Sequence, residues 1–271
     1  MDRSRPPVPR REPEGFRTSS GRGRYVYCVV ETEEPFELGP LGIGDEENVV
    51  YTVHEAGLAA VVSETPLRRY EPTRENLLAH EIVNETVMRE HTMIPMSFGT
   101  VFRSDDDVAA MLRGTAPELS EVLAALRGKV ELGLKVHWDR ETAISDLERE
   151  NAAIRELKAE IAADGNGSTY FARVQLGRLV EEALDERANA LMWSVYEPLR
   201  PLSVASRTSN PIGDDMLLNV AFLVERVREE EFDQAVKRLT SHHEDLLTFK
   251  YTGPWPPYSF VNIRLELEGA D

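Results

Sequence analysis

The sequence has almost no cysteine, no long apolar run and few aromatic residues. Its 271 residues include one cysteine, Cys28, which excludes an internal disulfide framework and a multi-cysteine metal site, and indicates a reducing, cytoplasmic setting. No apolar stretch approaches the ~18 residues typical of a membrane-spanning helix, and the polar, proline-rich start lacks the apolar segment of a secretory signal. Aromatic residues form 7% of the chain and are not interleaved with basic ones, as they are in single-strand nucleic-acid binders.

The charge is strongly acidic and unevenly distributed. The chain has 48 acidic and 31 basic side chains, which gives a formal net charge of −17. Residues 1–24 hold seven arginines and three acids, so the rest holds 31 − 7 = 24 bases and 48 − 3 = 45 acids, a net −21. A body of that charge repels phosphate backbones and anionic lipid heads, so we expect no nucleic acid and no lipid membrane as partner. Lysine is scarce, with five residues against 26 arginines.

What remains is a chain that can fold. A hydrophobic content of 41% is enough for a packed core, whereas residues 1–23 are rich in Pro, Arg, Ser and Gly and predict a disordered arm. The element pattern after the arm predicts an α+β protein of two domains, with helices over one face of an antiparallel sheet in each. We place the N-terminal domain at 24–128 and the C-terminal domain at 129–271.

The first domain has an irregular pattern, roughly βββαβα. Residues 25–30 predict a strand and residues 48–63 a hairpin. A helix over 73–91 has Leu78, Ile82, Val83 and Val87 as its expected apolar stripe. Residues 92–102 predict another strand, followed from 105 by a helix that is broken near Gly114 and resumes at Pro117.

The second domain has a clearer order, βαββαβ, with an enlarged first helical element. Residues 128–138 alternate apolar and polar side chains, which predicts a strand. Residues 139–197 predict a helical hairpin of two long helices, 139–163 and 170–196, joined by a Gly-rich turn. The remainder predicts two strands, a helix over 229–246 and a final strand at 259–267.

Catalytic patterns are missing from the sequence. It contains neither G-x-S-x-G nor H-E-x-x-H. His80 and His91 would lie roughly 16 Å apart on one helix, too far to share a metal, and His80 is more simply a structural histidine. We therefore expect no catalytic residue, no metal and no cofactor. The alternative is an enzyme or small-ligand-binding protein on an α+β sandwich, with His80 and His91 as its best candidates.

One segment, Tyr251–Val261, has an unusual density of prolines and aromatic residues. Three prolines restrict the backbone, so little conformational entropy remains to be lost on binding. The segment is either a rigid connection packed on its own domain or a docking surface, because aromatic side chains anchor interfaces well. The candidate interaction residues are Tyr251, Pro254, Trp255, Pro256, Pro257 and Tyr258.

Three sequence motifs resemble the gas vesicle protein F/L family. They are YTGPWPPYSFVN at 251–262, His80-Glu81-x-Val83 followed by IPMSFGTVF at 94–102, and Arg200-Pro201-Leu202. The resemblance marks a structural family motif that comprises His80, Pro95, Phe98, Gly99, Phe102 and Pro201.

The resemblance implies a role outside enzymology. It implies a non-enzymatic accessory or minor structural protein of gas vesicles, found in the cytoplasm and at the vesicle. Such a protein contacts the small hydrophobic shell protein and other accessory proteins during assembly. It also implies a modified ferredoxin-like domain followed by an α+β domain.

Overall fold

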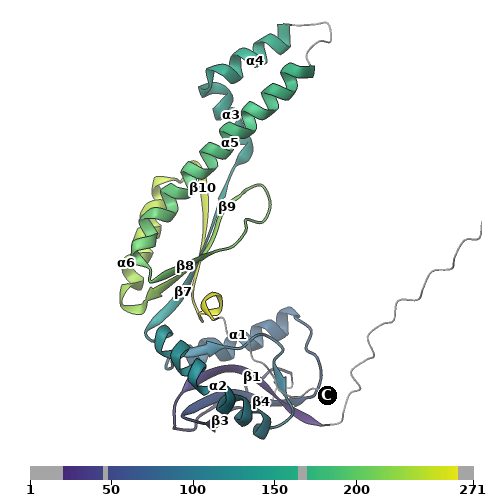
Figure 1. Ribbon diagram of the computed structural model, residues 1–271, viewed down its shortest axis with the longest axis vertical. Coiled ribbons are helices and arrows are strands. Elements are labelled where there is room, and N and C mark those ends of the chain that lie inside the picture. The colour runs from purple at the N-terminus through teal and green to yellow at the C-terminus, as the bar shows by residue number, and fades with distance from the viewer. Residues whose placement is uncertain (1–20, 45–47, 164–169, 262–271) are drawn as a thin grey trace, which may run out of the picture. The chain divides into compact units, whose positions relative to one another are not determined.

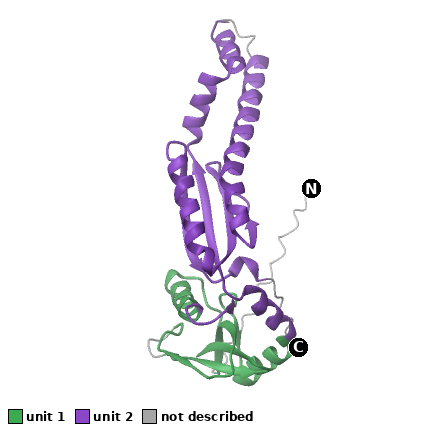
Figure 2. Ribbon diagram, turned by 90° about the vertical axis from the view of Figure 1, so that its left-hand side faces the viewer, with its two compact units in different colours: residues 1–87, 96–116, 265–271 green, residues 88–95, 117–264 purple. Residues whose placement is uncertain are grey.

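The structure is a computed structural model that describes residues 21–44, 48–163 and 170–261. It divides into two compact units (Figure 2). The described parts of 1–87 and 96–116 form the first unit, and 88–95 with the described part of 117–264 form the second. The boundary expected near residue 128 stays a prediction. Most of the expected arm, 1–20, lies outside the described residues, whereas Arg22 and Gly23 already belong to the first strand.

The first unit is built on an antiparallel sheet with strand order β2-β3-β4-β1, to which β6 is added by pairing with β1. Strands β1 and β4 are buried along most of their length, which explains their dense β-branched and small apolar residues. The elements are β1 (Arg22–Glu31), β2 (Glu37–Gly39), β3 (Val50–Glu55), β4 (Leu58–Pro66), α1 (Arg74–Met88), β6 (Val101–Phe102) and α2 (Asp105–Leu126). Strand β5 (Met93–Pro95) lies in the 88–95 segment, and the unit boundary falls inside α2.

The second unit has a four-stranded sheet with order β10-β7-β9-β8, in which every neighbouring pair is antiparallel. Helices α5 and α6 lie on the same side of this sheet (Figure 1). The core between them is formed by alternate residues of the strands, such as Leu132 and Phe222, against helix residues such as Val195 and Phe232. The elements are β7 (Lys129–Trp138), α3 (Arg140–Glu150), α4 (Ala152–Ala163), α5 (Tyr170–Leu199), β8 (Ala205–Thr208), β9 (Met216–Glu225), α6 (Glu229–His242) and β10 (Leu247–Trp255), with short 3₁₀ turns at Arg200–Leu202, Arg226–Arg228 and Tyr258–Phe260.

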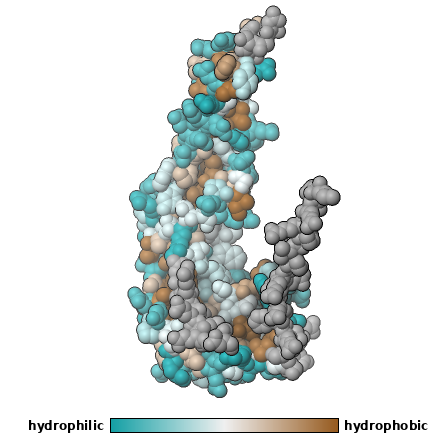
Figure 3. Space-filling model, turned by 45° about the vertical axis from the view of Figure 1, so that its right-hand side comes forward, coloured by the Kyte–Doolittle hydropathy of each residue, from teal (hydrophilic) through white to brown (hydrophobic). Residues whose placement is uncertain are grey.

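The helical hairpin expected over 139–197 has three helices instead of two. Helix α3 ends at Glu150 and α4 begins at Ala152, because Asn151 is extended (φ −89°, ψ 113°). Its backbone N–H donates to the Leu147 carbonyl, and its side-chain oxygen accepts from the N–H groups of Ala153 (3.0 Å) and Ile154 (3.3 Å). One asparagine therefore closes α3 and caps α4. On the face drawn in Figure 3, this part of the unit is mostly hydrophilic, with separate hydrophobic patches.

Three further expectations were wrong in detail. Helix α2 is continuous, with Pro117 inside it; its buried stripe, which includes Leu112 and Leu119, holds the helix together where proline removes one backbone bond. Residues 92–102 form two short strands, β5 and β6, separated by a turn in which Gly99 has φ +85°. Residues 258–260 form a 3₁₀ turn where the last strand was expected to begin, and the part from 262 onward lies outside the described residues.

No helix within the described ranges is both long and apolar enough to cross a membrane. The α+β class is confirmed by the two sheets and the helices packed on them.

Replacement of Asn151 by alanine should loosen α4. Loss of an asparagine N-cap costs about 1 kcal/mol, so amide hydrogen exchange over 152–163 should accelerate about fivefold. The matched control is Asn189→Ala in the exposed interior of α5, where alanine should leave exchange unchanged or slow it. Equal exchange rates over α4 in wild type and Asn151→Ala would show that the cap does not hold this helix.

Candidate functional site

The proline–aromatic segment Tyr251–Tyr258, here called the ridge, is the end of an edge strand and the turn that follows it. Strand β10 pairs with β7 from Leu247 to Thr252, and the register then shifts so that Trp255 lies opposite Glu131. Between them the Gly253–Pro254 peptide is cis and Gly253 has φ +124°. A Cβ on Gly253 would lie 2.9 Å from the Glu131 carbonyl oxygen, so the close approach to β7 requires glycine here.

The six ridge residues proposed from the sequence differ in exposure. Pro254 and Tyr258 are exposed, Trp255 is half-buried, and Pro256 and Pro257 are buried. Tyr251 faces the helices: its hydroxyl donates to the Asp233 carboxylate and its ring stacks on Phe232 at 6.3 Å between centroids. The structure therefore presents Pro254, Tyr258 and part of Trp255 outward, while the other three hold the segment in place.

Glu131 fixes the end of the ridge on β7. Its carboxylate accepts one hydrogen bond from the Ser259 backbone N–H and one from the Ser259 hydroxyl, both at 2.7 Å. Burial raises the pKa of Glu131, and the two Ser259 hydrogen bonds oppose that rise. Sequence reasoning missed this residue because, in the alternating pattern of β7, a glutamate is indistinguishable from an ordinary solvent-facing one.

His80 belongs to a buried polar cluster in the first unit. Its Nδ1 lies 3.0 Å from the Tyr25 hydroxyl and its Nε2 lies 3.0 Å from the Asn84 side-chain amide. The Gly99 N–H donates to the same Tyr25 hydroxyl at 3.0 Å, and the Phe98 ring lies edge-on to His80. Burial lowers the pKa of His80 from 6.5 to about 4, so the ring is neutral at pH 7. The imidazole is 3% exposed and is shielded from solvent.

The remaining motif residues are dispersed. Pro95 is buried in β5, and Phe102 is buried in β6. Pro201 is exposed in the 3₁₀ turn after α5. The structure thus brings together His80, Phe98 and Gly99 around Tyr25, a residue that the sequence analysis placed in the first strand without giving it a role in the site.

Helix α1 confirms two residues of the apolar stripe expected from its sequence, Val83 and Val87, and contradicts the other two. Its buried residues are His80, Val83, Asn84 and Val87, whereas Leu78 and Ile82 are exposed. The prediction for Leu78 and Ile82 was wrong because two polar residues occupy core positions: His80, which is hydrogen-bonded to the Tyr25 hydroxyl, and Asn84, which is hydrogen-bonded to His80. Hydrophobicity alone does not reveal such an exchange.

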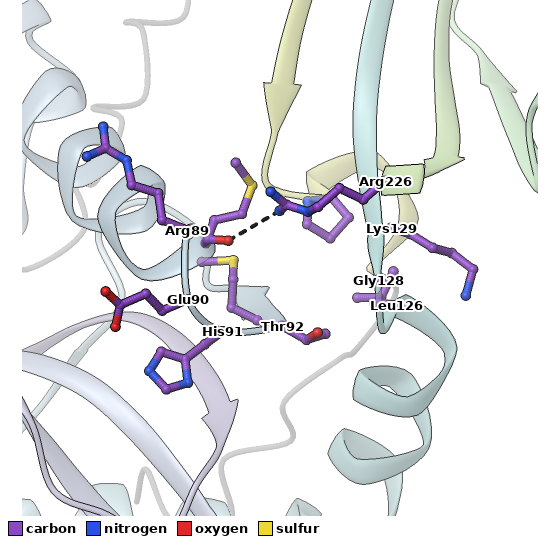
Figure 4. Close-up of a pocket in the computed structure, with 11 residues that line it drawn as sticks. Arg89, Glu90, His91, Thr92, Leu126, Gly128, Lys129 and Arg226 are labelled. Atoms are coloured by element: carbon purple, nitrogen blue, oxygen red, sulfur yellow. Dashed lines mark hydrogen bonds between the residues drawn. The ribbon is translucent and has the colours of Figure 1, made fainter. Parts of the chain in front are cut away.

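A cavity of about 160 Å³ in the second unit is lined by His91 together with residues such as Lys129 and Arg226. It is smaller than the ~300–1,000 Å³ of ordinary ligand pockets. In Figure 4 the charged ends of Arg89, Glu90 and Lys129 point away from one another, and Arg226 donates to the Met88 carbonyl at 3.3 Å. His80 lines neither this cavity nor the smaller one beside Trp138. Within the described residues no group of three or more His, Cys, Asp or Glu side chains is arranged to hold a metal ion.

Comparison with known proteins identifies the family of this chain. A family model described as gas vesicle synthesis protein GvpL/GvpF matches residues 23–262, which include every motif residue named above. The chain belongs to this family. It is 33% identical to gas vesicle protein F of a Streptomyces species over 88% of this chain and 98% of that protein, and 32% identical to gas vesicle protein F of Haloferax mediterranei over 91% and 95%.

A solved family structure has the same fold. The crystal structure of the gas vesicle protein GvpF from Anabaena matches with a TM-score of 0.80 and 25% identity, covering 90% of this chain and all of that one. Gas vesicle protein L1 of Halobacterium salinarum is also similar, at 25% identity over 88% of this chain and 90% of that protein. Relatives of both branches therefore match over nearly the whole chain.

Replacement of His80 by glutamine should flatten the acid sensitivity of folding. The pKa of His80 is lower in the folded state than in the unfolded state, so its contribution is complete above pH 6.5 and is lost as the pH falls toward 4. The full loss is about 3 kcal/mol, of which about 1 kcal/mol occurs between pH 7.5 and 5.5. Urea unfolding at these two pH values, both above the isoelectric point of 4.9, should show that difference in wild type and not in His80→Gln.

The control for this test is His242→Gln, an exposed histidine at the end of α6. It should keep the pH dependence of wild type. A His80→Gln variant that loses as much stability on acidification as wild type would assign the acid sensitivity to other groups.

Replacement of Glu131 by alanine should release the end of the ridge. Hydrogen bonds to a charged group contribute about 1.5–3 kcal/mol, so amide exchange over 256–261 should accelerate at least tenfold. Ser259→Ala, which removes only the hydroxyl bond, should have a smaller effect, and the exposed Glu225→Ala should have none. Unchanged protection in Glu131→Ala would mean that the prolines alone hold the ridge.

Proposed function

We propose that the protein binds the small hydrophobic shell protein of gas vesicles, together with other vesicle proteins, during vesicle assembly, without catalysing a reaction. Family membership supports a part in gas vesicle formation. The observation that carries the finer proposal is the exposed apolar stripe of α1, where Leu77, Leu78 and Ile82 are 43%, 56% and 38% exposed.

An exposed stripe of this kind is suited to an apolar partner. Leucine and isoleucine at positions i and i+4 project from the same side of a helix. Leu78 and Ile82 have this spacing and are not among the buried residues of α1. Exposed apolar side chains grouped on one element mark interaction sites more often than scattered ones do. The strongly acidic remainder of the protein keeps such a complex soluble.

The ridge is proposed as a second contact. Pro254 and Tyr258 are exposed on a segment that Glu131 and the prolines already hold in one conformation. A pre-organised surface loses little entropy on binding, so even a small contact can add affinity. Trp255, half-buried, would contribute through its exposed edge, and Tyr251, Pro256 and Pro257 through their support of the shape.

The family resemblance also favours a finer description of the architecture. We propose that the N-terminal unit is a modified ferredoxin-like domain. In the second unit, the element order and the strand order β10-β7-β9-β8 are those of a split βαβ arrangement with an enlarged first connection.

Capture of the shell protein should depend on α1. In co-expression with the small shell protein, the double variant Leu78→Asp, Ile82→Asp should retain its fold, because exposed substitutions usually change stability by under about 0.5 kcal/mol each, and should lose at least 90% of the captured shell protein. Tyr258→Ala and Pro254→Ala should each reduce capture less. Co-purified shell protein per folded molecule is the measurement.

The matched control is Ile212→Asp, Val227→Asp, which puts two charges at apolar residues that are 69% and 90% exposed elsewhere. It should capture as much shell protein as wild type. If folded wild-type protein captures no shell protein, the proposed binding is wrong. If all variants capture as much shell protein as wild type, binding occurs but α1 and the ridge are not its contact surfaces.

A further inference from the structure

The four-stranded sheet of the second unit has one face without helices. Helices α5 and α6 cover the face that carries Leu132, Leu134 and Val136. On β7 the opposite face therefore carries the alternate residues Glu131, Gly133, Lys135 and His137. We call this the open face.

Two lysines lie directly opposite each other on the open face. Lys135 of β7 pairs in register with Lys250 of β10, and on the other side of Lys135 the partner is Asn219. Like charges directly opposite on neighbouring strands are destabilising. Within the described ranges the side chain of neither lysine has a hydrogen bond or an ion pair. The repulsion is therefore not offset inside this part of the chain.

What sets this pair apart from the other lysines is that the two face each other, since Lys237 on α6 also has no side-chain partner within the described residues. Lys158 forms an ion pair with Glu148, and the Nζ of Lys129 donates to the Ala125 carbonyl at 2.6 Å. Lys135 and Lys250 are two of only five lysines in a chain of net charge −17. In a chain with this excess of acids, two cations lie side by side, and no described carboxylate forms an ion pair with either of them.

The other residues of the open face add one more cation, Arg207. Arg207 of β8 lies in register with Ala221 and its guanidinium lies over the Phe260 ring at 5.8 Å. The two acids closest in the register are already engaged, since Glu131 accepts from Ser259 and Asp215 lies 3.2 Å from His137. Gly133 and Ala221, which lie between Arg207 and Thr252, add no bulk. The open face is thus low and cationic around Lys135, whereas its other end, at Glu131 and Arg207, is contacted by Ser259 and Phe260 and carries the buried Leu223.

We propose that the open face binds an acidic polypeptide segment of a partner protein, with Lys135 and Lys250 as the central contacts. Complementary charge on the partner turns the repulsion between the two lysines into attraction for carboxylates. Nucleic acids and anionic membranes are disfavoured, because they extend well beyond this face and meet the strongly acidic remainder of the protein. The inference does not depend on the binding of the hydrophobic shell protein, which concerns α1 and the ridge.

The experiment uses a fluorescein-labelled ten-residue peptide of alternating Glu and Thr, with a Gln–Thr peptide of the same length as the neutral probe. Fluorescence anisotropy with the full chain should show binding of the acidic peptide only, and binding should weaken strongly between low and high salt. The double variant Lys135→Gln, Lys250→Gln should reduce the affinity at least tenfold. The single variant Lys250→Gln should also raise the melting temperature by about 1–2 °C, because it removes the like-charge pair.

The matched control is Lys158→Gln, Lys237→Gln, which has the same net charge as the test variant and should bind within twofold of wild type. No binding of the acidic peptide by wild type, or equal loss in the two double variants, would overturn the proposal. A DNA duplex or phosphatidylserine vesicles that bind more tightly than the peptide, and lose binding in Lys135→Gln, Lys250→Gln, would overturn the assignment to a polypeptide.

Discussion

The alternation of β7 is the constraint on which the second unit depends. This strand pairs with β10 on one side and with β9 on the other, so its register determines both neighbours. One face of the strand supplies Val130, Leu132 and Leu134 to the core. The other face supplies Glu131, which holds Ser259, and Gly133, whose missing side chain leaves room for Thr252. A shift of one residue would exchange these two sets and remove the core and the ridge together.

The first unit depends instead on satisfied polar groups in its core. Tyr25 and Tyr27 are both fully buried, and each hydroxyl has partners: Tyr25 with His80 and Gly99, and Tyr27 with Ser63 and the Ile43 N–H. A buried hydroxyl without a partner would cost about 1–3 kcal/mol and so offset much of the free energy gained by burying its ring. The helix that supplies His80 and Asn84 must turn this polar side inward. Its leucines then face outward, and the same constraint that stabilises the core creates an apolar surface.

The fold could be predicted from the sequence where periodicity and burial agree. The alternation of β7 and the hydrophobic run of β9 predict strands, and the structure has both. The prediction for α1 was confirmed for Val83 and Val87 but wrong for Leu78 and Ile82, because His80 and Asn84 are core residues, which a hydrophobic pattern does not indicate. The prediction of a single helix over 139–163 was wrong because Asn151 satisfies backbone groups of two helices at once. The residues that pair across strands could not be predicted from the sequence. Nothing in the local pattern shows that Lys135 lies opposite Lys250, or that Glu131 accepts hydrogen bonds from Ser259.

These pairings also change the meaning of the acidic composition. A net charge of −17 describes the molecule at a distance, where it keeps the protein soluble and repels extended polyanions. At contact distance only the nearest groups matter, because salt screens exposed charges over about 8–10 Å. Among the described residues, Glu131 and Asp215 already have hydrogen-bond partners, so the nearest charges around Lys135 are those of the two lysines rather than the average charge. An apolar stripe on α1 and a cationic face on the second sheet are therefore compatible with one acidic protein, and each suits a different chemical class of partner.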